Sequence, residues 1–97
     1  MPVERGPFDI VWSPLALARF QEIRVFVALD KPEAAERLAT RIVSVVETLR
    51  IHPYLGRVGS EPGTRELIIG GTPYSILYRV RVRRVFIATI SHASQSK

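Results

Sequence analysis

The spacing of the apolar residues changes once along the chain, and this change decides the fold class. Between Pro14 and Leu49, apolar residues recur at steps of three and four, which is the period of a helix with one buried side. After Arg65 they alternate with polar residues or follow one another directly, and Ile, Val, Tyr and Phe dominate, as in strands. Helices and strands that are segregated in this way predict an α+β fold.

Two proline-containing sites predict where the helices begin. The hydroxyl of Ser13 can cap a first helical turn, and Pro14 suits the first helical position because its missing N–H is not needed there. We therefore expect a helix from residue 14 to about residue 29. The pattern breaks before Pro32, which has the same property, so a second helix is expected over residues 32–49. The two helices should form an antiparallel hairpin.

The remaining segments predict a sheet packed on these helices. A period of two over residues 8–12 indicates a short N-terminal strand, and further strand signals cover residues 65–69, 74–80 and 84–91. The last three segments have short connections, so they should pair as an antiparallel meander. The last strand is almost continuously apolar and is expected at the centre of the sheet, covered on both faces. Residues 51–64 are rich in Gly and Pro and are expected to form a loop.

Length, cysteine content and charge exclude several classes of protein. A chain of 97 residues has room for one domain, here residues 1–97. It has no cysteine and two distant histidines, so we expect neither a metal nor another cofactor, and the reducing cytoplasm is the simplest location. The first twelve residues lack the apolar core of a signal peptide, and no apolar run is long enough for a membrane span. The net charge of +5 favours a polyanion or an acidic protein as partner.

Six short motifs, in this order, resemble the ParE branch of the ParE/RelE toxin superfamily. They are Trp12-Ser13-Pro14, Pro32-Glu33-Ala34-Ala35, Pro62-Gly63-Thr64-Arg65-Glu66-Leu67, Gly71-Thr72-Pro73-Tyr74, Tyr78-Arg79-Val80 and Ile90-Ser91-His92-Ala93. The resemblance covers nearly the whole chain. It implies a strand, a helix hairpin and a three-stranded meander, in agreement with the periodicity.

The resemblance also implies a biological role. Toxins of this superfamily belong to type II systems, in which a small antitoxin wraps the toxin, neutralises it and represses the shared operon. Operator DNA is thus expected to be a partner only indirectly, through the antitoxin. The antitoxin should carry an acidic, helical C-terminal segment. ParE-like members inhibit DNA gyrase and have no known hydrolytic site, whereas RelE-like members cut messenger RNA on the ribosome.

The residues favour the gyrase inhibitor over the ribonuclease. RNA cleavage needs cations for the charge that develops on the phosphate, and RelE-like sites resemble that requirement. This sequence has Glu66 and Ile68 where basic residues would help, and Ser75 where an arginine would follow the tyrosine. Gln95 lies near the position of a later arginine, and no tyrosine follows the last strand. We therefore expect a non-enzymatic toxin.

Two alternatives stay open at this stage. In the first, the protein is a RelE-like ribosome-dependent endoribonuclease that uses His92 as acid or base, together with arginines of the hairpin around residues 81–83. A strand-end histidine that only packs is the simpler interpretation of His92. In the second, the chain is a basic interaction domain without toxicity.

Charge and apolar surface suggest which residues bind partners. Antitoxin binding is assigned to an apolar groove and to two arginines on one face of a strand: Leu17, Phe20, Val25, Tyr78, Arg79 and Arg81. Of these, Phe20 and Tyr78 have the residue types most often found in a core, whereas Leu17 and Val25 lie off the main apolar stripe. Target binding is assigned to Arg83, Arg84 and His92. A solvated sheet edge would explain the same arginines without any partner.

Overall fold

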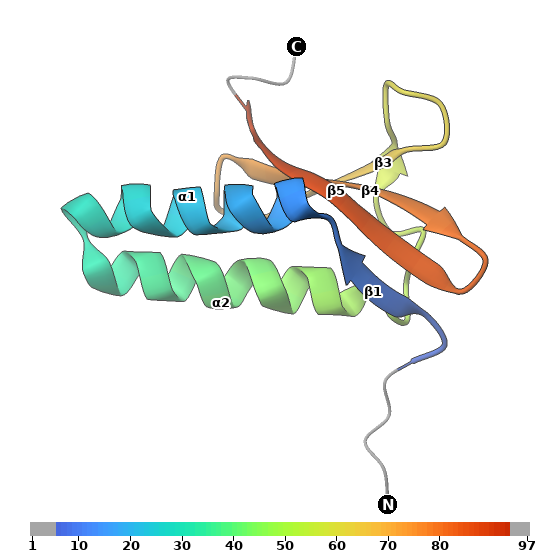
Figure 1. Ribbon diagram of the computed structural model, residues 1–97, viewed down its shortest axis with the longest axis horizontal. Coiled ribbons are helices and arrows are strands. Elements are labelled where there is room, and N and C mark those ends of the chain that lie inside the picture. Colours follow the sequence, from blue (N-terminus) through green and yellow to red (C-terminus); the bar gives the residue numbers. More distant parts are fainter. Residues whose placement is uncertain (1–5, 94–97) are drawn as a thin grey trace, which may run out of the picture.

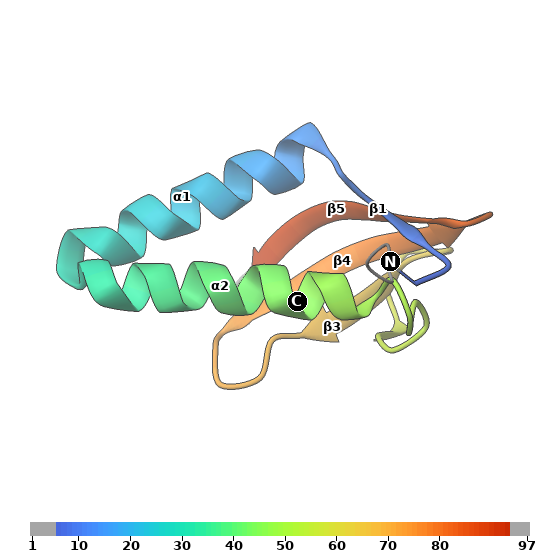
Figure 2. The same ribbon diagram turned by 90° about the horizontal axis from the view of Figure 1, so that it is seen from below.

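The computed structural model describes residues 6–93, which form two layers. In chain order the elements are β1 (Asp9–Trp12), α1 (Pro14–Asp30), α2 (Pro32–Thr48), β2 (Arg57–Val58), β3 (Arg65–Ile68), β4 (Tyr74–Arg81) and β5 (Arg84–His92). The five strands form one sheet in the order β1-β5-β4-β3-β2. Figures 1 and 2 show both helices along one side of the twisted sheet, with the β4–β5 hairpin projecting past the helix ends. The predicted α+β fold is confirmed.

Strand β5 lies inside the sheet, between β1 and β4, as predicted. It pairs in parallel with β1 and antiparallel with β4. On the helix side, Val85 and Ile87 are fully buried. On the other side, Phe86 and Thr89 remain partly exposed, so only one face of β5 is covered. The sheet therefore has one closed face and one open face, and the expectation of cover on both faces is wrong.

The core lies between the helix hairpin and the closed face of the sheet. Its fully buried members include Ala16 of α1, Ile42 and Val46 of α2, and Ile76 and Ile87 of the sheet. These helical residues belong to the three-and-four-residue repeats that predicted the helices, because such spacing places them on one side of each helix. No helix within residues 6–93 combines the length and the apolar character that a membrane crossing requires.

Ser13 joins the start of α1 to the sheet. Its hydroxyl oxygen accepts a hydrogen bond from the N–H of Ala16 at 2.9 Å, which is the predicted N-cap. The same hydroxyl donates to the carbonyl of Ala88 at 2.7 Å. The pairing of β4 with β5 shifts register here, since Leu77 lies opposite Thr89 but Tyr78 lies opposite Ile87. Ala88 is thus the extra residue of a β-bulge, and Ser13 satisfies its carbonyl.

Two side chains of the sheet, those of Tyr78 and Arg65, hold the loop between α2 and β3 through hydrogen bonds to Gly56. The N–H of Gly56 donates to the buried hydroxyl of Tyr78 at 2.8 Å. Arg65 donates to the carbonyl of Gly56 at 2.8 Å, and its guanidinium lies 5.0 Å from the ring centroid of Tyr54. The loop also contains β2, which was not predicted. These contacts give Arg65 and Tyr78 structural roles.

Replacing Tyr78 with phenylalanine is expected to lower the free energy of unfolding by about 1–3 kcal/mol, because the buried N–H of Gly56 loses its acceptor. Urea denaturation measures the change. Tyr74→Phe is the matched control, since Tyr74 is also buried in β4 but makes no hydrogen bond through its hydroxyl among the described residues. Equal stability of Tyr78→Phe and Tyr74→Phe would contradict this account of the loop.

Candidate functional site

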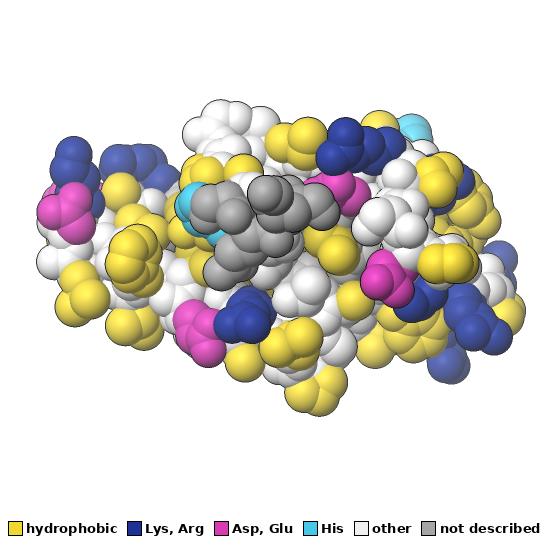
Figure 3. Space-filling model, turned by 90° about the horizontal axis from the view of Figure 1, so that it is seen from above, with side chains coloured by type: hydrophobic (Ala, Val, Ile, Leu, Met, Phe, Trp, Pro, Cys, Tyr) yellow, Lys and Arg dark blue, Asp and Glu magenta, His cyan; other side chains and the backbone are white. Residues whose placement is uncertain are grey.

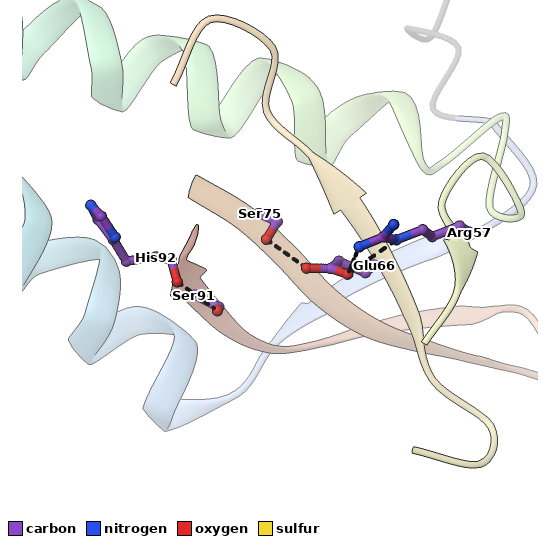
Figure 4. Close-up of polar contacts among 5 residues, drawn as sticks. All are labelled: Arg57, Glu66, Ser75, Ser91 and His92. Atoms are coloured by element: carbon purple, nitrogen blue, oxygen red, sulfur yellow. Dashed lines mark hydrogen bonds and ion pairs between the residues drawn. The ribbon is translucent and has the colours of Figure 1, made fainter. Parts of the chain in front are cut away.

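The open face of the sheet carries a polar cluster at its β2–β3–β4 side, which we call the Glu66 cluster. It consists of Arg57, Glu66 and Ser75, from three neighbouring strands (Figure 4). The guanidinium of Arg57 donates to one carboxylate oxygen of Glu66 at 2.7 Å, and the hydroxyl of Ser75 donates to the other at 2.9 Å. Both carboxylate oxygens of Glu66 are therefore occupied.

The electrostatics of this cluster favour an ionised carboxylate. The hydrogen bond from Arg57, followed by the one from Ser75, lowers the pKa of the Glu66 carboxyl below its ordinary value and outweighs the effect of burial. The negative charge of Glu66 in turn neutralises Arg57. Such a cluster offers no unpaired positive charge to a phosphate whose negative charge is increasing.

Glu66 is expected to make the free energy of unfolding depend on pH. Its folded-state pKa is lowered, so its contribution is present above the ordinary glutamate pKa of about 4.3 and is lost as the pH falls through the lower folded value. At pH 7, Glu66→Gln should therefore be less stable than the wild type by about 1 kcal/mol, because Arg57 is largely exposed. Urea denaturation between pH 7 and pH 2.5 should show this difference shrinking, and a difference independent of pH would contradict the prediction.

His92 lies on the other face, toward α1. Its ring packs edge-on against Tyr74, with ring centroids 5.2 Å apart. Together with Phe26 and Glu22 of α1 it lines a depression of about 330 Å³. Figure 4 shows its side chain directed away from Glu66 and Ser75. The sequence could not indicate this orientation, because the bulge at Ala88 changes which residues of β5 share a face.

His92 is also remote from the hairpin arginines with which it was grouped. Arg84 and His92 are the two ends of β5, which places them about 26 Å apart at a rise of about 3.3 Å per residue. Arg83 and Arg84 therefore lie far from His92, and the assignment of all three residues to target binding stays a prediction. The same separation excludes a catalytic group built from His92 and these arginines in one chain.

The end of the β4–β5 hairpin carries four arginines, and we call this region the basic hairpin. Arg79 and Arg81 share one face of β4, as predicted. Arg81 lies directly opposite Arg84, and Arg79 lies opposite Phe86, so Arg84 is on this open face too. Arg83 is in the exposed turn. These arginines, with Asp9, Val82 and Phe86, line a shallow concavity of about 800 Å³. In Figure 3, dark blue side chains gather at the right edge, where Figure 1 places this hairpin.

The four arginines differ in their contacts. Arg79 donates to the carbonyl of Pro62 at 3.0 Å and so helps to hold the loop before β3. Among residues 6–93, no carboxylate lies within ion-pair distance of Arg81, Arg83 or Arg84. The division of these arginines between antitoxin and target remains a prediction.

Helix α1 exposes apolar side chains on the side opposite the core. Leu17 is 50% exposed, Val25 61% and Leu29 82%. We call the uncharged side that contains them the outer strip of α1: Leu17, Ala18, Gln21, Val25, Ala28 and Leu29. The sequence analysis identified Leu17 and Val25 but missed Leu29. The sequence signal that could have identified Leu29 is that apolar residues occur on every side of α1.

The two aromatic residues assigned to the antitoxin groove differ in exposure. Phe20 is partly buried, packs edge-on against Trp12, and lines a groove of about 440 Å³ between α1 and α2, with Val43 on the opposite helix. Tyr78 has no exposed surface. Its assignment to the groove is therefore wrong, because its ring belongs to the core and its hydroxyl holds Gly56.

Comparison with known proteins agrees with this geometry. Residues 10–97 match the family model of the ParE toxin of the type II toxin–antitoxin system parDE. A protein of Sinorhizobium fredii with the name "Putative toxin Y4kP" is 42% identical over 86 residues, or 89% of this chain and 88% of its own length. Toxin RelE2 of Caulobacter vibrioides is 35% identical over 87 residues, covering 90% of this chain and 97% of that protein.

Among solved structures, a chain of the chromosomal ParDE system from P. aeruginosa shares the arrangement of helices and strands. It superposes with a TM-score of 0.82 at 26% identity, over 89% of this chain and 96% of that chain. The similarity thus extends over almost the full length of both molecules.

Proposed function

The chain belongs to the ParE toxin family of type II toxin–antitoxin systems, and from this premise we propose that it inhibits DNA gyrase by protein contact, without catalysis. We further propose that a cognate antitoxin neutralises it. The observation that carries the first proposal is the Glu66 cluster. At two positions where RNA-cutting relatives are expected to carry cations, this chain has Glu66 and Ser75, and the charge of Glu66 is paired with Arg57.

The chemistry of RNA cleavage explains why this observation matters. Attack of a 2′-hydroxyl on the neighbouring phosphate needs a base, an acid for the leaving oxygen, and positive charge near the phosphate. Glu66 would repel that phosphate, and its charge cancels that of Arg57. His92 lies on the opposite face of the sheet. These features support a toxin that acts by binding.

The outer strip of α1 supports the antitoxin proposal. An amphipathic helix binds through apolar anchors at steps of three and four residues, and the outer strip offers an uncharged, apolar surface on that scale. The groove between α1 and α2 lies beside Phe20 and extends this surface. An acidic segment that follows such a helix would find the exposed arginines of the basic hairpin, in particular Arg79 and Arg81. The solved P. aeruginosa neighbour is itself part of a ParDE system.

Gyrase inhibition is tested with purified components. Toxin added to gyrase and relaxed plasmid is expected to block supercoiling or to trap cleaved DNA, and equimolar antitoxin should restore activity. Glu66→Gln should inhibit as the wild type does, because the Glu66 cluster is not proposed to contact gyrase. No inhibition at saturating toxin would contradict the proposal.

The ribonuclease alternative retains one observation in its favour, which is the 35% identity to a protein named RelE2. Mapping RNA ends after induction of the toxin decides it. Codon-linked cuts that disappear in His92→Ala would establish the ribonuclease, and transcripts without such cuts would exclude it.

A further inference from the structure

Arg81 and Arg84 form a like-charged pair, and the carboxylate of Asp9, opposite Arg84 on β1, is not within ion-pair distance of either guanidinium. They lie directly opposite each other on adjacent strands, so their side chains leave the same face of the sheet in close proximity. Opposed like charges destabilise a sheet. No described carboxylate pairs with either guanidinium, and Arg79 adds a third positive charge two residues along β4. An anion bound between them would remove this repulsion.

The turn that joins the two strands is strained at Val82. This residue has a φ of +58°, which a β-branched side chain rarely adopts, and it is 92% exposed. Gly, Asn or Asp would fill such a hairpin turn without this penalty. No packing inside the protein compensates, because the side chain faces solvent. The strain and the exposed apolar group therefore constitute a second observation at the same place, independent of the charges.

The shape of the basic hairpin matches one class of anion. It is a two-stranded antiparallel ribbon whose end projects past the helix layer (Figures 1 and 2). A ribbon of this kind fits the major groove of B-form DNA, which is about 12 Å wide. Arginine forks bind phosphate oxygens in pairs, and three of them line one face while Arg83 lies in the turn.

The composition of the surface suits nucleic acid in the free toxin, where no acidic antitoxin segment covers Arg79 and Arg81. Protein interfaces have apolar centres that can include arginine, but they are far less positively charged than interfaces with DNA. The concavity at the basic hairpin is instead dominated by four arginines, with only Val82 and Phe86 as apolar members and Asp9 as its acidic one. Protein–DNA interfaces have this strongly positive character.

We propose that the basic hairpin binds the phosphate backbone of duplex DNA directly, with Arg81 and Arg84 sharing one stretch of backbone and Val82 making an apolar contact in the groove. Operator binding through an antitoxin does not require this contact. The inference rests on the proposed function only for the role of DNA binding in the cell, which is that the toxin binds the DNA held by gyrase. DNA binding itself needs no gyrase.

The test is fluorescence anisotropy with toxin separated from its antitoxin and a labelled 20-base-pair duplex over a series of salt concentrations. The logarithm of the binding constant should fall linearly with the logarithm of the salt concentration, by about 0.9 for each phosphate contact. Arg81→Ala/Arg84→Ala should reduce this slope by about 2 and weaken binding at low salt at least ~10-fold. Val82→Gly should raise the melting temperature, because glycine relieves the strain, yet weaken DNA binding.

Arg37→Ala/Arg41→Ala is the matched control, since it removes two exposed arginines of α2 that have no described ion pair. This control should keep the wild-type slope. An equal loss of DNA affinity in both double variants would overturn the proposal, because net charge alone would then explain the binding. So would an affinity for duplex RNA equal to that for DNA, because the major groove of A-form RNA is too narrow for the ribbon. Competition by polyglutamate as strong as by unlabelled DNA would assign the surface to an acidic protein instead.

The failure of this inference can be distinguished from the failure of the proposed function. Toxin that inhibits supercoiling but does not bind the duplex overturns DNA binding and leaves gyrase inhibition in place. Toxin that binds the duplex through Arg81 and Arg84 but does not affect gyrase overturns gyrase inhibition and leaves DNA binding in place.

Discussion

Leu17→Asp/Val25→Asp is expected to escape neutralisation, with the affinity for the antitoxin reduced at least ~100-fold, equivalent to about 2.7 kcal/mol. In the proposed complex, both side chains face the apolar side of the antitoxin helix. Two carboxylates there would lose water without gaining a cation, which costs several kcal/mol. Both positions are at least half exposed in the free toxin, so its fold should persist. Titration calorimetry measures the affinity, and growth during co-expression with the antitoxin reports neutralisation.

Leu15→Asp is the matched control for this experiment. Leu15 is 51% exposed on the same helix, close to the 50% of Leu17, but it projects from a different side. It should leave the affinity within a few-fold of wild type. Wild-type affinity in the Leu17→Asp/Val25→Asp variant would remove the outer strip of α1 from the antitoxin interface.

Gly56→Ala is expected to lower the free energy of unfolding by about 3 kcal/mol or more, a large part of the stability of a small domain. A methyl group here would lie 2.8 Å from both the carbonyl oxygen of Glu66 and the hydroxyl of Tyr78. The loop would have to move, and this would break the hydrogen bond that Gly56 donates to Tyr78. Arg57 follows directly in the chain, so its ion pair with Glu66 should weaken too. Urea denaturation gives the stability.

Gly71→Ala separates crowding from backbone conformation. Gly71 has a φ of +79°, but nothing lies within 4 Å of an added methyl group. This variant should lose only about 1 kcal/mol, from the unfavourable backbone angle. A Gly56→Ala variant as stable as Gly71→Ala would contradict the close packing of the loop on Tyr78.

Local signals in the sequence were sufficient for most of the fold. The cap at Ser13, the prolines at 14 and 32, and the two apolar periods predicted both helices and the longer strands, because they act within a few residues. The parallel pairing of β1 with β5 joins segments more than 70 residues apart, and no local pattern encodes it. The two-residue strand β2 lies in a loop rich in Gly and Pro, where no strand signal is present.

The candidate site was less predictable for the same physical reason. The family resemblance predicted that Glu66 and Ser75 stand where RNA-cutting members carry cations, but not that Arg57 would reach Glu66, since that contact depends on the pairing of β2 with β3. The alternation along β5 could not place His92, because the bulge at Ala88 interrupts it. The side chain of Tyr78 was assigned to a groove, and only the packing of the loop shows that it is enclosed.

The central claim is that this toxin acts by binding gyrase and not by cutting RNA, and the most direct measurement is induction of the toxin alone in living cells with two simultaneous readouts. A reporter of the DNA-damage response and the rate of protein synthesis are followed from the moment of induction. We predict an early DNA-damage response, with protein synthesis declining only later. Immediate arrest of translation, with cut ribosome-bound transcripts and no DNA-damage response, would contradict the account.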